Sequence, residues 1–373
     1  MPPEAEGIYD EERYAKCLAY DKANGRLGMI SSSLSILISL ALLIGGGFGW
    51  IDAWLRQYTE QPIWLALLFF GVLGLGSSII PLPFSIYSTF VIEEKFGFNK
   101  TTVKTFILDM IKGTALSLAI GVPLGALIIW LYLELGNYFW LAAWVVISAF
   151  RIFMTMFAAT LIMPIFNKFE PLPEGELRTA IEDYYAKVGF KLNRLFVMDG
   201  SKRSAKSNAF FSGLGPKKTI ALYDTLIDQM ETEEIVSVLA HYKKQHTMQS
   251  MVLSILQSGV MLFVLGLFLR HDVFSLALGA EHGSFHVGMI AFGIIFSPIS
   301  TVVGIAMNVL SRKNEFEADA YAKETYKGEP LASGLKKLTA ENLGNLKPHP
   351  AYVFVHYSHP PVLKRLERLE IGE

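Results

Sequence analysis

Two histidines, His241 and His246, lie close together on a stretch that is expected to be helical. Two helical histidines chelate one metal ion when they are four residues apart, because positions i and i+4 share a face. These two are five apart, which turns them about 140° from each other. Gln245, four residues after His241, is a poor zinc ligand, and Tyr242 cannot act as a carboxylate base at neutral pH. The pair alone therefore fits two ordinary helix residues.

A second histidine pair, His282 and His286, has the helical spacing of four. Gly283 and Ser284 lie between the two histidines and make a helix there doubtful. We therefore do not predict a second metal site at this place.

The composition indicates a membrane protein. Hydrophobic residues make up 52% of the 373 residues, and the mean hydropathy is +0.37. Such a chain is too apolar for a soluble domain. The net charge of −1 gives no reason to expect nucleic acid as a partner, and the single cysteine, Cys17, excludes an internal disulfide.

Six long runs carry no charge or almost none, and each exceeds the roughly 20 residues needed to cross a bilayer. Only Arg151 interrupts the fourth run. The segments 52–60, 134–135 and 270–286 hold only Arg56 and Arg270 as basic residues, so the positive-inside rule places the opposite segments in the cytoplasm. The six predicted spans are 27–51, 61–92, 113–133, 136–166, 247–269 and 287–311.

The segments outside the predicted spans are expected to form a small cytoplasmic α+β part. An amphipathic helix is expected over 176–188, short strands over 194–198 and 219–222, and an edge strand over 204–211. Thr232 is expected to cap the helix that carries His241. We divide the chain into an N-terminal cytoplasmic helix (1–26), four spans (27–165), a soluble metallopeptidase insert (166–246), two spans (247–311) and a C-terminal cytoplasmic part that completes the peptidase domain (312–373).

Several segments together resemble the type-I CAAX prenyl proteases, which are integral-membrane zinc endopeptidases. Their order and spacing carry the resemblance, which runs from about residue 80 to the C-terminus. The segments are PFSIYSTFVIEEKFGFN (83–99), FNKFEPLPEG (166–175), DGSKRS (199–204), SNAF (207–210), LYDTL (222–226), EFEADA (315–320) and HYSHPP (356–361). The resemblance implies a mainly α, polytopic fold with six helices around a chamber and a small zincin-like domain.

The resemblance also implies roles for individual residues. His241 and Glu315 match zinc ligands, and Asp319 matches the acid that orients a ligand histidine. His359 matches a catalytic histidine that stabilises the tetrahedral intermediate. Asn208 and Arg365 match substrate-binding positions. Each has a plainer alternative: a surface glutamate for Glu315, a cap or turn for His359, and a solvated face for Arg365.

The family motif L-A-H-E-x-G-H is incomplete in this chain, which reads L-A-H followed by Tyr242 and Lys243. Four residues are missing, among them one zinc-binding histidine and the glutamate that activates water. His241 aligns with either family histidine. Removing four residues turns the following helix by only about 40°, so the fold can persist.

We therefore expect a membrane zinc metalloendopeptidase of the CAAX prenyl protease type, inactive or strongly impaired as written, with zinc weakly bound or absent. Peptides, including prenylated C-termini, and membrane lipids are the expected partners. The bacterial inner membrane and the endoplasmic reticulum membrane are both open as locations. One alternative is a non-catalytic membrane module that binds peptides or lipids. A weaker one is a transporter, although the spans show no inverted repeat.

Overall fold

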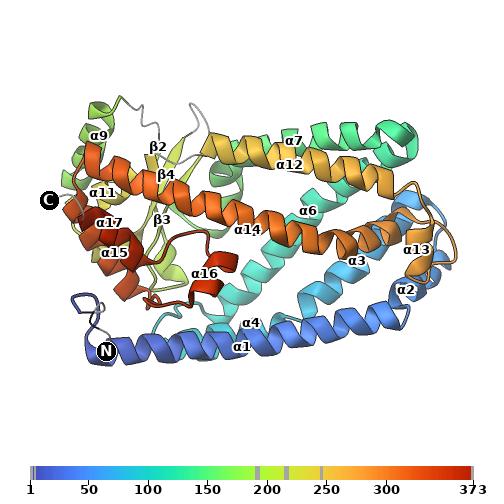
Figure 1. Ribbon diagram of the computed structural model, residues 1–373, viewed down its shortest axis with the longest axis horizontal. Coiled ribbons are helices and arrows are strands. Elements are labelled where there is room, and N and C mark those ends of the chain that lie inside the picture. The colour runs from blue at the N-terminus through green and yellow to red at the C-terminus, as the bar shows by residue number, and fades with distance from the viewer. Residues whose placement is uncertain (1–2, 4–5, 190–193, 214–217, 244–246, 371–373) are drawn as a thin grey trace.

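The computed structural model is elongated, with long helices along most of its length and a small sheet with shorter helices at one end (Figure 1). It describes residues 3, 6–189, 194–213, 218–243 and 247–370. Both chain ends lie at the end of the molecule that carries the sheet. This arrangement confirms the mainly α fold with a small α+β part.

Five described segments are long and apolar enough to cross a membrane. The third, Val103–Phe166, contains two helices, α6 (Val103–Leu135) and α7 (Phe139–Phe157), joined by a 3-10 turn, η3 (Gly136–Tyr138). The predicted spans 113–133 and 136–166 thus form separate helices, but length and composition give five segments and not the six predicted. The other long helices are α1 (Glu11–Ile44), α3 (Pro62–Ile79), α12 (Thr247–Phe268) and α14 (Phe285–Thr325).

The first helix differs from the predicted span 27–51. The side chain of Asp10 accepts a hydrogen bond from the backbone of Arg13 and caps α1, which then continues from Glu11 to Ile44 without a break. Gly45 and Gly46 end the helix, and Gly46 has a φ of 65°, which favours glycine. A separate short helix, α2 (Gly47–Arg56), follows. The charged residues before Leu27 thus mark a change in polarity and not the start of the helix.

The predicted span 61–92 is interrupted after Ile79, next to Pro81 and Pro83. Proline lacks a backbone N–H and therefore breaks the ladder of helical hydrogen bonds. The chain continues as α4 (Leu82–Tyr87), a π-helical turn, η2 (Ser88–Glu93), and the short helix α5 (Glu94–Phe96).

The sheet has four strands in the order β1-β2-β4-β3. Strands β2 and β4 are parallel, whereas β1 and β3 pair antiparallel with them at the two edges. The two central strands lie where the sequence predicts them, and β3 confirms an edge strand in the second half of 204–211. The strands are β1 (Phe169–Pro171), β2 (Arg194–Met198), β3 (Ala209–Ser212) and β4 (Thr219–Tyr223).

The core of this part lies between β4 and the helix α11 (Thr232–Lys243), which packs against α9 (Glu176–Lys187) and α14. Ile181, Tyr185, Leu222 and Leu239 are fully or almost fully buried there. The predicted helix over 176–188 is confirmed. The remaining helices are α7's continuation η4 (Ala158–Ile162) and α8 (Met163–Phe166), then η5 (Gly200–Lys202), α10 (Asp224–Gln229), α13 (Val273–Ala277), α15 (Gly328–Glu341), α16 (Pro350–His356) and α17 (Val362–Glu370).

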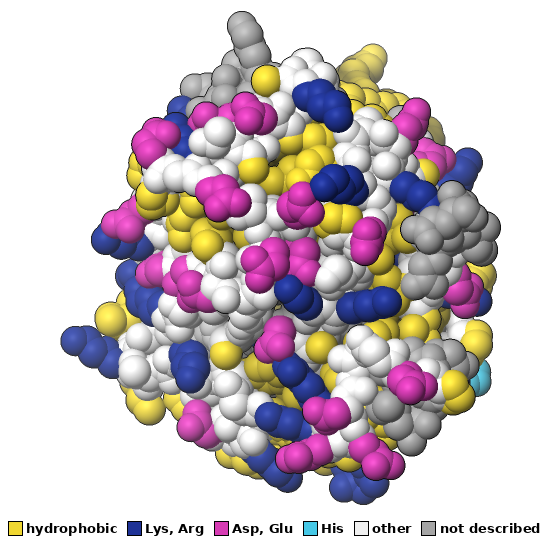
Figure 2. Space-filling view, turned by 90° about the vertical axis from the view of Figure 1, so that its left-hand side faces the viewer, with side chains coloured by type: hydrophobic (Ala, Val, Ile, Leu, Met, Phe, Trp, Pro, Cys, Tyr) yellow, Lys and Arg dark blue, Asp and Glu magenta, His cyan; other side chains and the backbone are white. Residues whose placement is uncertain are grey.

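The two ends of the molecule differ in surface chemistry. Figure 2 shows the end that carries the sheet, where Lys, Arg, Asp and Glu side chains are interspersed among apolar ones. The long helices instead expose large apolar side chains, for example Leu37 (63%) and Ile79 (63%). Such surfaces are stable against lipid tails, and these helices therefore make the chain an integral membrane protein that crosses the bilayer several times.

Candidate metal centre

Helix α11 holds His241 in a fixed position inside the sheet end. At its start, the Glu234 carboxylate accepts hydrogen bonds from the Glu231 backbone (2.9 Å), Ser333 Oγ (2.6 Å) and Lys337 Nζ (2.8 Å). Further along, Tyr185 Oη donates to the carbonyl of Leu239 (3.0 Å). The helix begins at Thr232, so the expected N-cap residue is the first helical residue instead. His241 itself is 5% exposed.

Helix α14 directs two carboxylates at this one imidazole. Glu315 Oε2 lies 3.3 Å from His241 Nε2, and Asp319 Oδ1 lies 3.0 Å from His241 Nδ1. Because Glu315 and Asp319 are four residues apart, they share a face of the helix. Both ring nitrogens of His241 are therefore occupied by acidic partners.

The C-terminal segment completes the cluster with a histidine and an arginine. His359 Nδ1 lies 3.1 Å from Glu315 Oε2, although the His359 side chain is 68% exposed. Arg365, on α17, binds both oxygens of Asp319, with Nη2–Oδ1 at 2.7 Å and Nε–Oδ2 at 2.9 Å. Arg365 Nη1 also lies 3.7 Å from Glu315 Oε2. Five residues that the sequence singled out thus meet in space.

Two residues that sequence analysis missed hold His359 in place. Asn308 Nδ2 donates to the carbonyl of Val355 (2.8 Å), and Arg312 Nη1 donates to the carbonyls of Val353 (3.1 Å) and Tyr357. These contacts fasten α16 and the segment before His359 to α14. Asn308, Arg312, Glu315 and Asp319 follow the spacing 4, 3, 4, which is one face of a helix. That spacing is the signal in the sequence that could have revealed them.

The charges within the cluster balance one another. Burial alone would lower the pKa of His241, but its hydrogen bonds with Asp319 and Glu315 outweigh burial and raise that pKa. Imidazolium and guanidinium groups then face two carboxylates in a nearly closed network. Ionic groups removed from water need such partners, because an unpaired buried charge is strongly destabilising.

The cluster fits a zinc ion only in part. Two ligands of a tetrahedral zinc ion at about 2.0–2.2 Å lie roughly 3.3–3.6 Å apart, which matches the 3.3 Å between His241 Nε2 and Glu315 Oε2. A catalytic zinc site needs a third protein ligand. Within the described ranges, no group of three or more His, Cys, Asp or Glu side chains is arranged to hold a metal ion. His246 lies outside the described residues. The described residues therefore do not complete a catalytic zinc site.

Asn208 stands immediately before the edge strand β3. It is exposed, its Oδ1 accepts from the Ala209 backbone (2.8 Å), and its carbonyl accepts from the Tyr223 backbone (3.1 Å). The preceding Ser207 is fixed by Asn342, whose side chain accepts from the Ser207 N–H (3.1 Å) and donates to its carbonyl (3.2 Å). The start of the edge strand is thus held by α10 and α15 neighbours and does not depend on the charged cluster.

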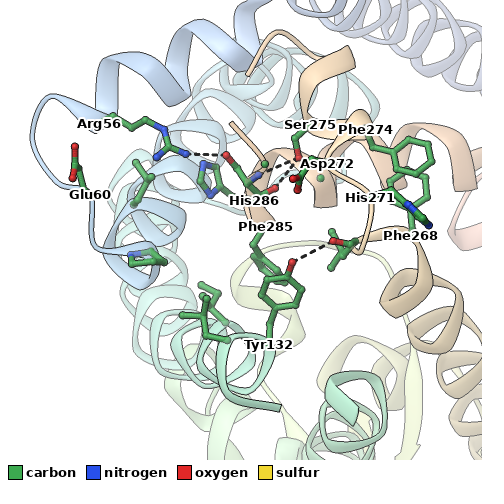
Figure 3. Close-up of a pocket in the computed structure, with 18 residues that line it drawn as sticks. Arg56, Glu60, Tyr132, Phe268, His271, Asp272, Phe274, Ser275, Phe285 and His286 are labelled. Carbon is green, nitrogen blue, oxygen red and sulfur yellow. Dashed lines mark hydrogen bonds between the residues drawn. The ribbon is translucent and has the colours of Figure 1, made fainter. Parts of the chain in front are cut away.

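A second buried polar cluster lies at the opposite end of α14. His286 Nε2 lies 2.6 Å from Asp52 Oδ1, and Arg56 Nε donates to Asp52 Oδ2 at 2.9 Å. Arg56 Nη2 also donates to Ser284 Oγ (2.9 Å), and these residues border a cavity of about 200 Å³ (Figure 3). Helix α14 begins at Phe285, so His282 lies outside it and does not share a helical face with His286.

Known protein families match the whole chain. The model described as the CAAX prenyl protease N-terminal domain with five membrane helices matches residues 1–168, and the model of peptidase family M48 matches residues 171–371. The fold and these matches define an integral-membrane zinc metallopeptidase of the M48 type. Within that class, the chain belongs to the CAAX prenyl protease family.

Individual relatives agree along the full length. The CAAX prenyl protease 1 homolog of Oryza sativa subsp. japonica is 38% identical over 388 residues, covering 99% of this chain and 90% of the relative. CAAX prenyl protease 1 of Saccharomyces cerevisiae is 34% identical over 404 residues, with 99% and 88% covered. The crystal structure of S. mikatae Ste24p superposes with a TM-score of 0.94 at 33% identity, covering 99% and 92%. The resemblance seen in the sequence is thereby confirmed.

Proposed function

We propose that this chain is a CAAX prenyl protease whose hydrolytic centre is incomplete, so that it binds peptides at the membrane but cleaves them poorly or not at all. The observation that carries the proposal is the single buried histidine, His241, shared by Glu315 (3.3 Å) and Asp319 (3.0 Å). In the family motif, a second histidine and a glutamate would follow, and the sequence has neither at those positions.

The missing groups have separate chemical consequences. Without the second histidine, only His241 and Glu315 remain as matched ligands, and metal affinity falls with the number of protein ligands. Without the glutamate, no carboxylate stands next to His241 in the sequence to accept a proton from water. Arg365 pairs with Asp319 and also lies near Glu315. These contacts of Arg365 stabilise the two carboxylates when no metal is bound. Zinc binding by this chain should therefore be weak.

The peptide would bind along β3, in this proposal. The outer edge of this strand lies at the border of the sheet, and an extended peptide can add to such an edge through backbone hydrogen bonds. Asn208 stands exposed at the start of the strand, and Arg365 and His359 would contact the peptide near the cluster. The names of these relatives, CAAX prenyl proteases, point to prenylated C-terminal peptides as substrates.

We infer that the sheet end faces the cytoplasm. The segments on the other side of the predicted spans hold only Arg56 and Arg270 as basic residues, which supports this orientation by the positive-inside rule. The bacterial inner membrane and the endoplasmic reticulum membrane are equally compatible with it.

The test compares the chain with two insertion variants. One carries Glu-Leu-Gly-His inserted after His241, which restores the motif, and the other carries four alanines at the same place as a matched control. Zinc content is measured by elemental analysis in detergent, and peptide cleavage is measured with a prenylated peptide. Only the restored protein should hold about one zinc ion and cleave, with a rate at least roughly a thousandfold above the others.

Near-stoichiometric, tightly held zinc in the unmodified chain would contradict the proposal. It would mean that another donor completes the site. Equal cleavage by the unmodified and restored chains would contradict it as well.

A further inference from the structure

A groove between α1 and the segment α4–η2–α5 stands apart from the charged cluster. Its volume is about 560 Å³. From α1 it is lined by residues at positions 23, 26, 27 and 30, a spacing that places them on one helical face. The opposite wall includes Phe84, Tyr87 and Val91. This wall belongs to the segment 83–99, to which the proposed peptidase reaction assigns no role.

The groove is lined mostly by apolar side chains, with two cations among them. Leu27, Phe84 and Val91 form apolar walls, and Arg26 and Lys95 are the basic residues of the lining, one from each wall. None of the described residues that line the groove is acidic. The carboxylates that precede Lys95 in the sequence have partners of their own: Glu93 pairs with Lys206 (3.0 Å) and Glu94 accepts from Asn99 (2.9 Å).

The positions of the two cations match the level of lipid headgroups. Arg26 directly precedes the uncharged run 27–51, and Lys95 follows shortly after the uncharged run 61–92. Both cations therefore stand where an apolar, membrane-spanning stretch ends. Basic side chains at this level attract anionic lipids of the cytoplasmic leaflet.

The backbone of the outer wall is unusual. The π-helical turn Ser88–Glu93 follows α4 directly, and single π-turns within helices are frequent at functional sites. On this turn Val91 lines the groove, while Glu93 binds Lys206 and Tyr20 of α1. Neighbouring residues of this turn thus line the groove and also bind residues of the sheet end.

We propose that this groove binds one anionic phospholipid, with an acyl chain along the apolar walls and the phosphate between Arg26 and Lys95. Charge complementarity carries the choice of ligand: two cations at the mouth, apolar walls behind them, and a location between two membrane-spanning helices. The proposal is independent of metal binding and of peptide cleavage.

The test uses the full chain, stripped of lipid in detergent and analysed by native mass spectrometry. Phosphatidylglycerol and phosphatidylcholine with the same acyl chains are titrated separately. The chain should retain one phosphatidylglycerol molecule in preference to phosphatidylcholine. The double variant Arg26→Gln/Lys95→Gln should bind phosphatidylglycerol about 30-fold more weakly, because each cation near the surface contributes roughly a fivefold to sixfold factor.

A matched control removes two cations elsewhere on the same part of the molecule. Lys16 on α1 and Lys104 on α6 are exposed and do not line the groove. Lys16→Gln/Lys104→Gln should leave phosphatidylglycerol binding within about twofold. A third variant, Ile30→Trp, fills the apolar part and should weaken both lipids to a similar degree without changing the preference.

Three outcomes would overturn the proposal. Equal binding of the two lipids would show that no headgroup is recognised. An equal loss in the control variant would show a diffuse charge effect. Displacement of the lipid by a prenylated peptide, one for one, would assign the groove to substrate.

Discussion

Two clusters of the same residue types lie at the two ends of α14. At one end, His286 meets Asp52 and Arg56. At the other, His241 meets Glu315, Asp319 and Arg365 on the sheet side. Each joins a histidine, an arginine and at least one carboxylate, and residue composition alone would not tell them apart.

The difference lies in the balance of acids and in access to solvent. In the cluster of Asp52, Arg56 and His286, called the outer cluster below, one carboxylate, Asp52, binds two basic partners. Both Asp52 and His286 have at most 4% of their side chains exposed. In the sheet-end cluster, two carboxylates converge on one buried imidazole, and His359 remains 68% exposed. The first arrangement is complete and fastens α2 to α14. The sheet-end cluster has two carboxylates for one buried imidazole, and it is open to solvent at His359. This arrangement suits the binding of a ligand.

The largest expected effect breaks the outer cluster. Asp52→Ala removes the shared partner of Arg56 and His286 and should lower the free energy of unfolding by about 3–5 kcal/mol, because it leaves the buried His286 and the partly exposed Arg56 without their polar partner. Thermal unfolding in detergent measures it. Asp272→Ala, an exposed acid beside the same cavity, is the control and should change stability little. A small effect of Asp52→Ala would remove the distinction between a fastening cluster and a binding cluster.

An intermediate effect concerns the sheet-end cluster. In the chain with the restored motif, Asp319→Asn should weaken zinc affinity by about 10–100-fold, since Asp319 contacts His241 Nδ1 and would orient the ring toward a metal. Competition with a chelator measures the affinity. Glu317→Gln on the same helix is the control, because the Glu317 side chain is 43% exposed and pairs only loosely with Lys313 at 3.9 Å. Unchanged affinity in Asp319→Asn would make Asp319 a purely structural partner of Arg365.

The smallest effect tests how α11 carries His241. Burial alone would raise the pKa of Glu234, but hydrogen bonds from Lys337, Ser333 and the Glu231 backbone outweigh burial and lower it. Because the folded pKa lies below the ordinary 4.5, the ionised group stabilises the fold above pH 4.5, and this contribution is lost as the pH falls through the folded pKa.

Glu234→Gln should therefore lose about 1 kcal/mol of stability at pH 6 and show a weaker fall in stability between pH 6 and pH 3 than the unmodified chain. Unfolding followed across this pH range measures both. Glu233→Gln, whose side chain is 60% exposed, is the control. An unchanged acid slope in Glu234→Gln would mean that other groups hold the start of α11.

The sequence predicts the helices and strands of this fold better than it predicts where each of them begins and ends. Uncharged runs locate the long helices, and short segments rich in apolar residues locate β2 and β4, because both patterns are local. The start of α1 at Glu11 was not predicted, because the first span was located only from its uncharged residues. The Asp10 cap and the helical hydrogen bonds, and not polarity, determine where this helix begins. The turn at Gly136, in contrast, lies where the sequence separates the predicted spans 113–133 and 136–166.

The same distinction holds for the sites. Glu315, Asp319, His359 and Arg365 could be named because they stand in motifs. The link between Asp52 and His286 joins residues that are 234 positions apart, and no local pattern in the sequence encodes such a contact. Arg312 and Asn342 were missed for a related reason: they bind backbone carbonyl and amide groups of distant segments, which leaves no mark on the sequence of those segments.

The uninterrupted helix α14 fixes the distance between the outer cluster and Glu315. Between His286 and Glu315 the helix rises 29 residues, or about 43 Å at 1.5 Å per residue, whereas the hydrocarbon core of a bilayer is about 30 Å thick. Between these two residues the helix is thus about 13 Å longer than the lipid core is thick. For a helix along the bilayer normal, the two clusters cannot both lie in hydrocarbon, and a peptide held by a lipid anchor would need roughly four extended residues to cross such a difference in level.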